Sequence, residues 1–444
     1  MPTIIEIIKG LFIMEPNFLK WYITQGRLIL DVFHYVFDEI FHVFLYIAVI
    51  FTVAYLLLSL IVLFSRKKDK EKSFDLEKAP SVTIQIPTRN ELIALRCAEK
   101  CLDFNYPKDK FEIIIGDDSD NPEVSQKLSE FAEQHEQVRV IKREKNIGFK
   151  PGNLNNMLKH SNGDILVVFD SDFTPEQDFL KRIVAPFIHD KSISAVQSRW
   201  NFNNFNQNLV TILASTIVYV FHHVVLSFLN ISGTGTLCGS AEAIRKKDLI
   251  ELGGWTSGSL TEDIEYTLRL YKNNKKIKYL PTLQCYSEVP FIAKDLYKQQ
   301  MRWAYGVITS YKTHLKGIML SNLSSKNKFT STFAGFGYLM PVLILIMFVF
   351  GTLSFFTHRP APINLPLFFS ELGTNIILTS GLIVASLFAL YKEKKVKYAL
   401  KTLLASFSIG IVTTYYVNKG IFKSILKKPM QWYLLNKDVK STQS

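Results

Sequence analysis

The stretch DILVVFDSD, residues 164–172, joins a short apolar run to two aspartates. A bounded apolar run of this length, rich in β-branched residues, is typical of a buried strand. In parallel α/β sheets, ligands bind beyond the carboxyl ends of the strands, which is where Asp170 and Asp172 would lie. The stretch therefore predicts a parallel sheet with an acidic binding site at one edge.

The sequence around this stretch repeats the same alternation. Short apolar segments alternate with amphipathic ones, in the order 82–88, 91–102, 112–118, 122–135 and 138–144, and a further helix opens at Pro151. Strands that alternate with helices of this length predict a parallel sheet covered on both faces. A second acidic cluster, residues 117–120, directly follows one of these strands. We therefore expect an α/β fold with two acidic clusters at the same edge.

Each chemical pattern in this region has two interpretations. Hard carboxylate oxygens suit Mg²⁺ or Mn²⁺, which bind through one or two carboxylates together with substrate phosphates. Aspartates also cap turns and helices without any ligand. Lys150 opens a helix whose free N–H groups suit an anion, although proline at a first turn, as at Pro151, is ordinary. The segment Thr261-Glu262-Asp263 stands before an amphipathic helix, where a simple cap would also stand.

Long apolar segments predict an integral membrane protein. Residues 40–64 and 330–356 contain no charged side chain and are long enough to cross a bilayer as helices. Residues 374–391 and 402–417 are shorter candidates within a C-terminal membrane region, 330–417. Residues 1–39 are expected to form an interfacial helical lead-in.

The distribution of charge predicts the orientation. Residues 1–10 lack the basic start of a secretory signal, so the first span is expected to remain as an anchor. Basic residues at 66–72 would stay on the cytoplasmic side, together with the long middle region and the basic tail, 418–444. The apolar segment 210–231 is expected to be a buried or interfacial helix, because a crossing there would separate the acidic clusters from Asp263.

Composition limits the partners. The net charge of +13 arises largely from lysines beside the spans, for which anionic lipid headgroups are the simpler partner, and no nucleic-acid motif accompanies it. The four cysteines lack the spacing of a zinc site, so free thiols are expected. Protein partners cannot be read from the sequence.

The segment QQMRW, residues 299–303, places arginine beside tryptophan shortly before the chain becomes apolar. Alone, it is typical of an interfacial helix. Taken in order with Asp117, Asp170-x-Asp172 and Thr261-Glu262-Asp263, it resembles the family 2 processive β-glycosyltransferases, which include cellulose, hyaluronan and mannan-type synthases. The resemblance implies a Rossmann-like GT-A domain over residues 80–325, cytoplasmic and embedded in a helical transmembrane protein.

The resemblance also implies site residues and cofactors. By similarity, Asp263 is the general base, and Asp170 and Asp172 hold Mg²⁺ or Mn²⁺. The remaining implied contacts are Thr88, Glu91, Asp117, Lys150, Asp170 and Arg302 for the nucleotide sugar, usually a UDP sugar, and Cys238, Gly239, Gln299 and Trp303 for the acceptor. One displacement would invert the sugar carbon, which requires a single catalytic carboxylate, whereas a retaining hydrolase uses two.

Two departures and two alternatives accompany this interpretation. The spans are fewer than in many such synthases, and the tail KKPMQWYLLNKDVK, 427–440, resembles the gating loop of the family except that Leu435 or Asn436 replaces its threonine. The expected function is extension of a β-linked polysaccharide. The first alternative is a single transfer to a membrane lipid, and the second is a non-catalytic sugar-binding or export subunit.

Overall fold

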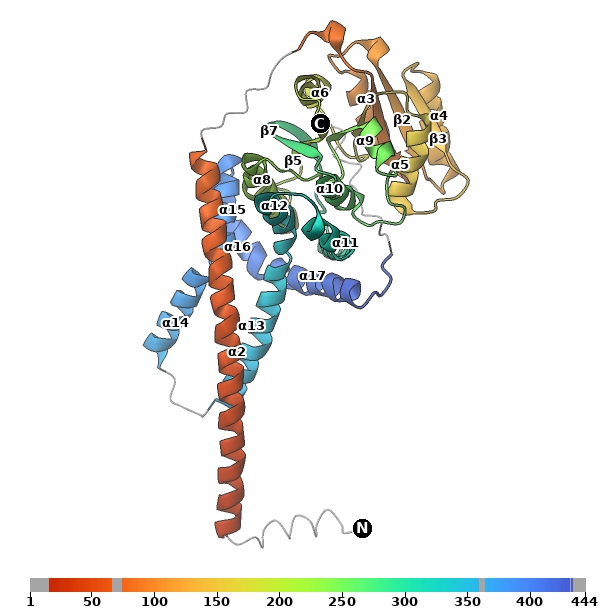
Figure 1. Ribbon diagram of the computed structural model, residues 1–444. Coiled ribbons are helices and arrows are strands. Elements are labelled where there is room, and N and C mark those ends of the chain that lie inside the picture. The colour runs from red at the N-terminus through yellow and green to blue at the C-terminus, as the bar shows by residue number, and fades with distance from the viewer. Residues whose placement is uncertain (1–15, 66–73, 359–363, 432, 434–444) are drawn as a thin grey trace. The chain divides into compact units, whose positions relative to one another are not determined.

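The computed structural model describes residues 16–65, 74–358, 364–431 and 433 (Figure 1). The chain divides into two compact units. One unit comprises Tyr55–Leu339 and Leu382–Ser444, and the other comprises Met1–Ala54 and Met340–Gly381. The described residues do not include residues 1–10, on which the prediction about a secretory signal rests, or the basic segment 66–72. Most of the predicted gating loop, 427–440, also lies outside the described residues.

A seven-stranded sheet forms the centre of the first unit, in the order β3-β2-β1-β4-β6-β5-β7. The strands are β1 (Val82–Thr88), β2 (Phe111–Asp117), β3 (Val138–Lys142), β4 (Ile165–Val168), β5 (Ile193–Phe202), β6 (Glu242–Arg245) and β7 (Lys276–Ser287). The first four strands in this order run parallel to one another. They therefore place the segments after β1, β2 and β4 at one edge.

The sheet is mixed, and the expectation of a wholly parallel sheet is wrong at one strand. Strand β6 runs antiparallel to both β4 and β5. Its first residue, Glu242, pairs with Val168, the last residue of β4. The chain thus enters β6 from the carboxyl-end edge of β4 and must run in the opposite direction.

Helices cover both faces of this sheet, as the alternation predicts (Figure 1). The helices α3 (Ile93–Leu102), α4 (Pro122–Glu133) and α6 (Phe179–His189) contribute to a core with one set of strand side chains. The helices α5 (Phe149–His160), α9 (Lys246–Glu251) and α10 (Glu262–Lys272) contribute to a second core. Alternate residues of β2 show the division, because Ile113 and Ile115 belong to the first core and Ile114 to the second.

The apolar segment at 210–231 forms α7 (Leu209–Val220), the π-helix η3 (Phe221–Leu226) and α8 (Ser227–Ser232). It is long and apolar enough to cross a membrane, yet 67% of its most apolar window is buried within the protein. Its His222 is buried, and the Tyr279 hydroxyl lies 3.4 Å from His222 Nδ1. The segment therefore packs as a core helix, in agreement with the buried interpretation.

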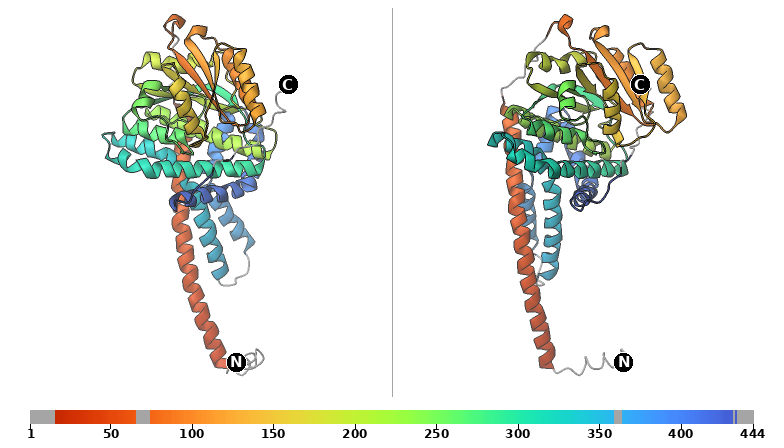
Figure 2. Two further views of the ribbon diagram at one scale, coloured as in Figure 1. Left: turned by 90° about the vertical axis from the view of Figure 1, so that its right-hand side faces the viewer. Right: turned by 45° about the vertical axis from the view of Figure 1, so that its right-hand side comes forward.

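A long helix carries the QQMRW segment. Helix α11 (Ala293–Leu320) is followed by α12 (Ser325–Phe336), and it packs side by side with α17 (Ile409–Ile425) near the end of the described chain (Figure 2). The Val396–Phe407 helical segment, which includes α16 (Ala399–Phe407), meets α17 at a bend of 54°. This break explains why the sequence at 402–417 is a weak candidate for a straight span.

The second unit is helical. Helix α2 (Pro16–Phe64) runs without a break, so the described part of the expected lead-in and the expected span at 40–64 belong to one helix. The unit also contains most of α13 (Leu339–Thr357) and all of α14 (Leu365–Leu378). Within the described residues, Ile23–Phe64, Leu209–Ser232 and Leu339–Thr357 are long and apolar enough to cross a membrane. The pairs α14 with α15 (Gly381–Lys392) and α16 with α17 would raise that number to five if each were one broken span.

Candidate active site

The strand ends bring the predicted nucleotide-binding residues to one edge. Thr88 and Asp117 are paired Cα partners at the ends of β1 and β2. The Thr88 hydroxyl donates to the Glu91 backbone oxygen at 3.2 Å, and the Ser171 hydroxyl donates to the Glu91 carboxylate. Glu91 therefore connects the end of β1 with the Asp170-Ser171-Asp172 turn.

Asp117 holds its own turn. Its Oδ1 accepts the Ser119 backbone N–H at 2.8 Å, its Oδ2 accepts the Ser125 hydroxyl, and the residue is only 1% exposed. The neighbouring Asp118 accepts both arms of the Arg143 guanidinium at 2.6 Å. Arg143 was missed by the sequence analysis, since a single arginine after β3 stands in no recognisable pattern.

Asp170 and Asp172 have different partners. Asp170 Oδ1 lies 2.6 Å from Lys150 Nζ, whereas Asp172 Oδ2 accepts the Glu288 backbone N–H at 3.3 Å. No group of three or more metal-ligating side chains occurs in the part of the chain that the structure describes. Two neighbouring carboxylates nevertheless suit Mg²⁺ or Mn²⁺, because these ions can take the rest of their ligands from substrate phosphates and water.

Lys150 connects three segments of the site. Besides Asp170, its Nζ lies 3.0 Å from Glu262 Oε1 and donates to the Gly239 carbonyl oxygen at 2.5 Å. Burial opposes the charge of Lys150, but the carboxylates of Asp170 and Glu262 outweigh it and raise the lysine pKa. Lys150 is therefore a fixed cation at the start of helix α5, whose free N–H groups also favour anions.

Asp263 lies in the first turn of α10, next to Glu262. Burial and the Glu262 carboxylate raise the pKa of Asp263 to about 7, although Lys150 opposes the shift. A carboxyl group with a pKa near neutrality can accept a proton from a hydroxyl during a reaction at physiological pH. The raised pKa of Asp263 is compatible with the role of base predicted from the sequence.

The Cys238-Gly239-Ser240 segment, here called the 238–240 loop, passes directly beside Asp263. Gly239 has φ +88°, and a Cβ atom there would lie 3.4 Å from Asp263 Cγ. The Ser240 hydroxyl accepts the Asp170 backbone N–H at 2.8 Å. A glycine at 239 therefore fits both the left-handed backbone and the close approach to the carboxylate.

Arg302 reaches the same cluster from helix α11. Its Nη1 donates to the Leu260 carbonyl oxygen at 2.8 Å. Burial lowers the pKa of Arg302, and the charges of Glu262, Asp170 and Asp263 oppose that shift. The arginine thus lies within electrostatic range of all three carboxylates.

Helices α10 and α11 approach closely beside these residues. A Cβ atom built on Gly306 would lie 2.5 Å from Thr261 Cγ2, which is too short for any real contact. The hydroxyls of Thr261 and Ser310 lie 3.5 Å apart along the same contact. The absence of a side chain at Gly306 therefore permits the spacing between the helix of Asp263 and the helix of Arg302.

The two other predicted site residues of the QQMRW segment, Gln299 and Trp303, are placed differently. Trp303 packs against the apolar cluster that contains Phe202, Leu213 and Leu296. Gln299 is half-buried on the same helix. The structure thus gives Trp303 a packing role, in addition to any role toward an acceptor.

Two further residues were missed by the sequence analysis. Glu242 is fully buried, and its carboxylate accepts the Gly239 backbone N–H at 2.9 Å. Tyr338 lies within electrostatic range of Asp263 and Arg302. No sequence signal marks either residue, because each stands alone between apolar or small neighbours.

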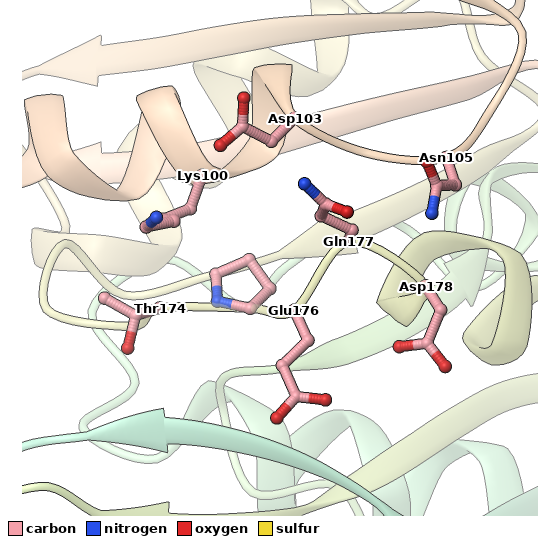
Figure 3. A pocket seen from close by; sticks show the side chains of 8 residues that line it. Lys100, Asp103, Asn105, Thr174, Glu176, Gln177 and Asp178 are labelled. Atoms are coloured by element: carbon pink, nitrogen blue, oxygen red, sulfur yellow. The ribbon is translucent and has the colours of Figure 1, made fainter.

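A separate hollow lies elsewhere on the same unit (Figure 3). It has a volume of about 560 Å³ and is lined by Lys100, Asp103, Asn105 and residues 174–178. None of the residues of the candidate site lines it. The hollow therefore adds nothing to the chemistry of the site.

The mixed sheet with its acidic edge is consistent with a GT-A type glycosyltransferase domain. A sequence profile described as "Glycosyltransferase like family 2" matches residues 79–306, more than half of the chain. The chain belongs to this family.

Curated relatives include glycosyltransferases of bacteria and plants. The "Probable glycosyltransferase YdaM" of Bacillus subtilis (strain 168) is 29% identical over 239 residues, which cover 52% of this chain and 56% of that protein. "Glucomannan 4-beta-mannosyltransferase 2" of Arabidopsis thaliana is 31% identical over 268 residues, covering 56% of this chain and 50% of that protein. The chain thus spans about half the length of these relatives.

The fold is also similar to a solved structure. "Mannosyltransferase PcManGT from Pyrobaculum calidifontis in complex with GDP-Man and Mn2+" has a TM-score of 0.59 and 18% sequence identity. The similarity covers 90% of this chain and 100% of that chain. At this identity, the similarity shows a shared fold.

Proposed function

We propose that this protein is a membrane-embedded, inverting hexosyltransferase that transfers a sugar from a nucleotide sugar to a growing β-linked polysaccharide. The observation that carries the proposal is the cluster around Lys150. Lys150 Nζ lies within 3.0 Å of the carboxylates of Asp170, which follows β4, and Glu262, which begins α10. These residues lie at the edge of the sheet where ligands are expected to bind.

Lys150 and Arg302 supply positive charge for the diphosphate of the donor. The leaving diphosphate gains negative charge as the bond to the sugar breaks, and fixed cations stabilise that charge without reorganising. Asp170 and Asp172 would hold Mg²⁺ or Mn²⁺, which supplies further charge stabilisation when bound. The Lys150–Asp170 ion pair keeps both groups oriented until the donor binds.

Asp263 is the proposed general base. An acceptor hydroxyl becomes a competent nucleophile when a carboxylate removes its proton during attack, and the raised pKa of Asp263 suits proton uptake near pH 7. The 238–240 loop lies against Asp263 and forms the proposed acceptor side, together with Gln299 and Trp303. Thr88, Glu91 and Asp117 form the proposed nucleoside side.

The identity of the donor follows from the relatives only as a hypothesis. The names of the plant relative and of the Pyrobaculum protein refer to mannosyl transfer, and the latter was solved with GDP-Man. A donor panel should therefore include GDP-mannose beside the UDP sugars. The acceptor is proposed as a polysaccharide, and a membrane lipid is the alternative.

The bilayer is the proposed environment. Helices α2 and α13 have the length and composition of spans, and exposed apolar side chains such as Leu57, Phe348 and Phe355 suit lipid contact. We place the catalytic domain in the cytoplasm, where nucleotide sugars are available to it.

A donor panel with the purified full-length protein tests the proposal. We expect nucleotide release from one UDP or GDP hexose in the presence of Mn²⁺ or Mg²⁺, with products that lengthen over time on a gel. A single lipid-linked product would support the alternative acceptor. Absence of release from every donor, with a correctly folded protein, would overturn the proposed transferase activity.

A further inference from the structure

Glu242 is a buried acidic residue at the centre of the site that the proposed mechanism does not use. It is the first residue of β6, and it pairs with Val168 of β4 and Gln197 of β5. Its exposed fraction is 0%. A carboxyl group in such a position requires an explanation, because acidic residues are almost never fully buried without partners.

One carboxyl oxygen of Glu242 anchors the 238–240 loop. Oε2 accepts the backbone N–H groups of Gly239, at 2.9 Å, and Cys238, at 3.3 Å. Gln197 supports the same loop, since its Oε1 accepts the Cys238 backbone N–H at 2.8 Å and its Nε2 donates to the Ser240 backbone carbonyl oxygen at 3.0 Å. The loop is therefore attached to the sheet through two side chains.

The opposite side of the loop contacts three residues of the proposed mechanism. The Gly239 carbonyl accepts Lys150 Nζ, and the Gly239 backbone lies against the Asp263 carboxylate. The Ser240 hydroxyl accepts the Asp170 N–H. A displacement of the loop would consequently move the contacts of the cation and the base together.

The second carboxyl oxygen of Glu242, Oε1, favours the neutral form of the side chain. Oε1 has no hydrogen-bond partner among the described residues. An ionised carboxylate with an unsatisfied buried oxygen is costly, and the nearby charges of Asp263 and Glu262 add repulsion that Lys150 only partly offsets. Burial, followed by Asp263, raises the pKa of Glu242 to about 8.

We infer that Glu242 is an uncharged positioning residue, which fixes the 238–240 loop so that Lys150, Asp170 and Asp263 keep their places during transfer. The inference rests on the proposed function for its kinetic consequence. Its structural part, the anchoring of the loop, stands independently. A neutral acid is suited to this role because it accepts two N–H groups without adding a third negative charge beside Asp263 and Glu262.

Two substitutions separate hydrogen bonding from charge. Glu242→Gln retains an oxygen that accepts both N–H groups and is neutral, so we expect kcat and KM within about threefold of the wild type. Glu242→Ala removes the anchor, and we expect kcat to fall about 10-fold to 100-fold, because small misplacements of reacting groups are expensive. Nucleotide affinity and Tm should change little in Glu242→Gln, whereas both should fall in Glu242→Ala, because the Lys150 contact with the loop is disturbed and the buried Gly239 N–H loses its acceptor. Glu251→Gln, on the exposed side of α9, serves as the control.

Thiol labelling provides a readout that does not depend on activity. Cys238 lies on the loop, while the other cysteines, Cys97, Cys101 and Cys285, are fully buried. We expect Cys238 to react several-fold faster in Glu242→Ala than in Glu242→Gln or the wild type. Inactivity of the wild type toward every donor would overturn the proposed function while leaving this measurement intact.

Three results would overturn the inference. Wild-type kinetics and labelling in Glu242→Ala would show that the carboxyl group does not hold the loop. Equal damage in Glu242→Gln and Glu242→Ala would show that a negative charge is required. If Glu242→Ala does not fold, low activity in a folded Glu242→Gln would likewise show that a neutral acceptor at this position is not sufficient.

Discussion

Lys150 and Asp170 form an ion pair of 2.6 Å between the start of helix α5 and the end of strand β4. The pair lies at the edge formed by the carboxyl ends of the parallel strands, where sheets of this kind bind ligands. A diphosphate that enters this edge would exchange part of the carboxylate contact for its own, so the lysine is oriented before the donor arrives. The following predictions depend on this arrangement.

Removal of the cation should weaken donor binding. Lys150→Met keeps most of the side-chain volume but leaves Asp170 and Glu262 without their shared partner, and we expect nucleotide affinity to fall at least about 10-fold, as for loss of a charge-assisted contact of about 1.5–3 kcal/mol. Calorimetry with the nucleotide that the donor panel identifies measures the change. Lys127→Met, on the exposed side of α4, should leave the affinity unaltered.

Removal of one proposed metal ligand should change how nucleotide binding depends on the metal ion. Asp172→Ala deletes a carboxylate from the proposed metal site, so we expect nucleotide affinity to lose its dependence on Mn²⁺. Titration with and without Mn²⁺ gives the comparison. Asp178→Ala, which removes an exposed carboxylate after the same strand, is the control, and an unchanged response to Mn²⁺ in Asp172→Ala would place the metal elsewhere.

The pKa of Asp263 predicts the pH dependence of transfer. The base must be ionised to accept a proton, so kcat/KM should rise with pH and level off above about 7, the value to which burial and Glu262 raise this pKa. Asp263→Asn should lower turnover by about 10² to 10⁴ while donor affinity is retained. An acidic limb that persists in the residual activity of this variant would assign the limb to another group.

Substitutions at the adjacent residues Arg302 and Trp303 should affect different properties, diphosphate binding and stability respectively. Trp303→Ala removes an aromatic ring from an apolar cluster, so we expect a lower Tm, with a loss of stability below the about 3–5 kcal/mol typical of a fully buried large aromatic residue. Arg302→Ala should retain more stability but weaken diphosphate binding, since a guanidinium near three carboxylates is lost. Activity per folded molecule and Tm, measured together, distinguish the two; a normal Tm with low transfer in Trp303→Ala would favour direct acceptor contact.

The described part of the tail should share the compartment of the catalytic domain. Met430 packs against Leu260 and Met301 beside the site. A cysteine at Gln431 should therefore resist an impermeant thiol reagent in intact cells, as should one at Lys127 in helix α4. A cysteine at Ala361 should react if α13 crosses the bilayer. Labelling of Gln431→Cys without permeabilisation would contradict a cytoplasmic tail.

Much of the fold was predictable because the spacing of apolar residues along the sequence indicates which side chains are buried. Apolar runs such as residues 165–169, bounded by polar residues, are short and rich in β-branched residues, which favours buried strands over helices. The position of the aspartates after β2 and β4 followed from the edge rule for parallel sheets. The antiparallel direction of β6 was not predictable, since a four-residue strand carries no information on direction. The continuity of α2 was also missed, because aromatic residues such as Phe33 and Phe37 among scattered charges suggested an interfacial segment. In the structure, the Ser354 hydroxyl of α13 lies within hydrogen-bond distance of His34 and Asp38 of α2.

The site was predictable only where residues occur in motifs. Asp263 and Arg302 stand in recognisable patterns, and the structure brings both within electrostatic range of Glu262. Arg143 acts through Asp118, which is distant in sequence, and Glu242 accepts N–H groups of the nearby residues Cys238 and Gly239 in a geometry that exists only in the folded chain. Pairings of this kind depend on tertiary packing and leave no local signature.

The close contact between Gly306 and Thr261 has a consequence for inherited variation. Any substitution at Gly306 adds atoms between the helices that carry Asp263 and Arg302, while leaving every chemically active group in the chain intact. A population or a random library should therefore contain inactive alleles at this position that conventional inspection of catalytic residues would score as harmless. Their defect would be an increased distance between the two helices. A second substitution that shortens the side chain at 261, such as Thr261→Ala, should partly suppress it.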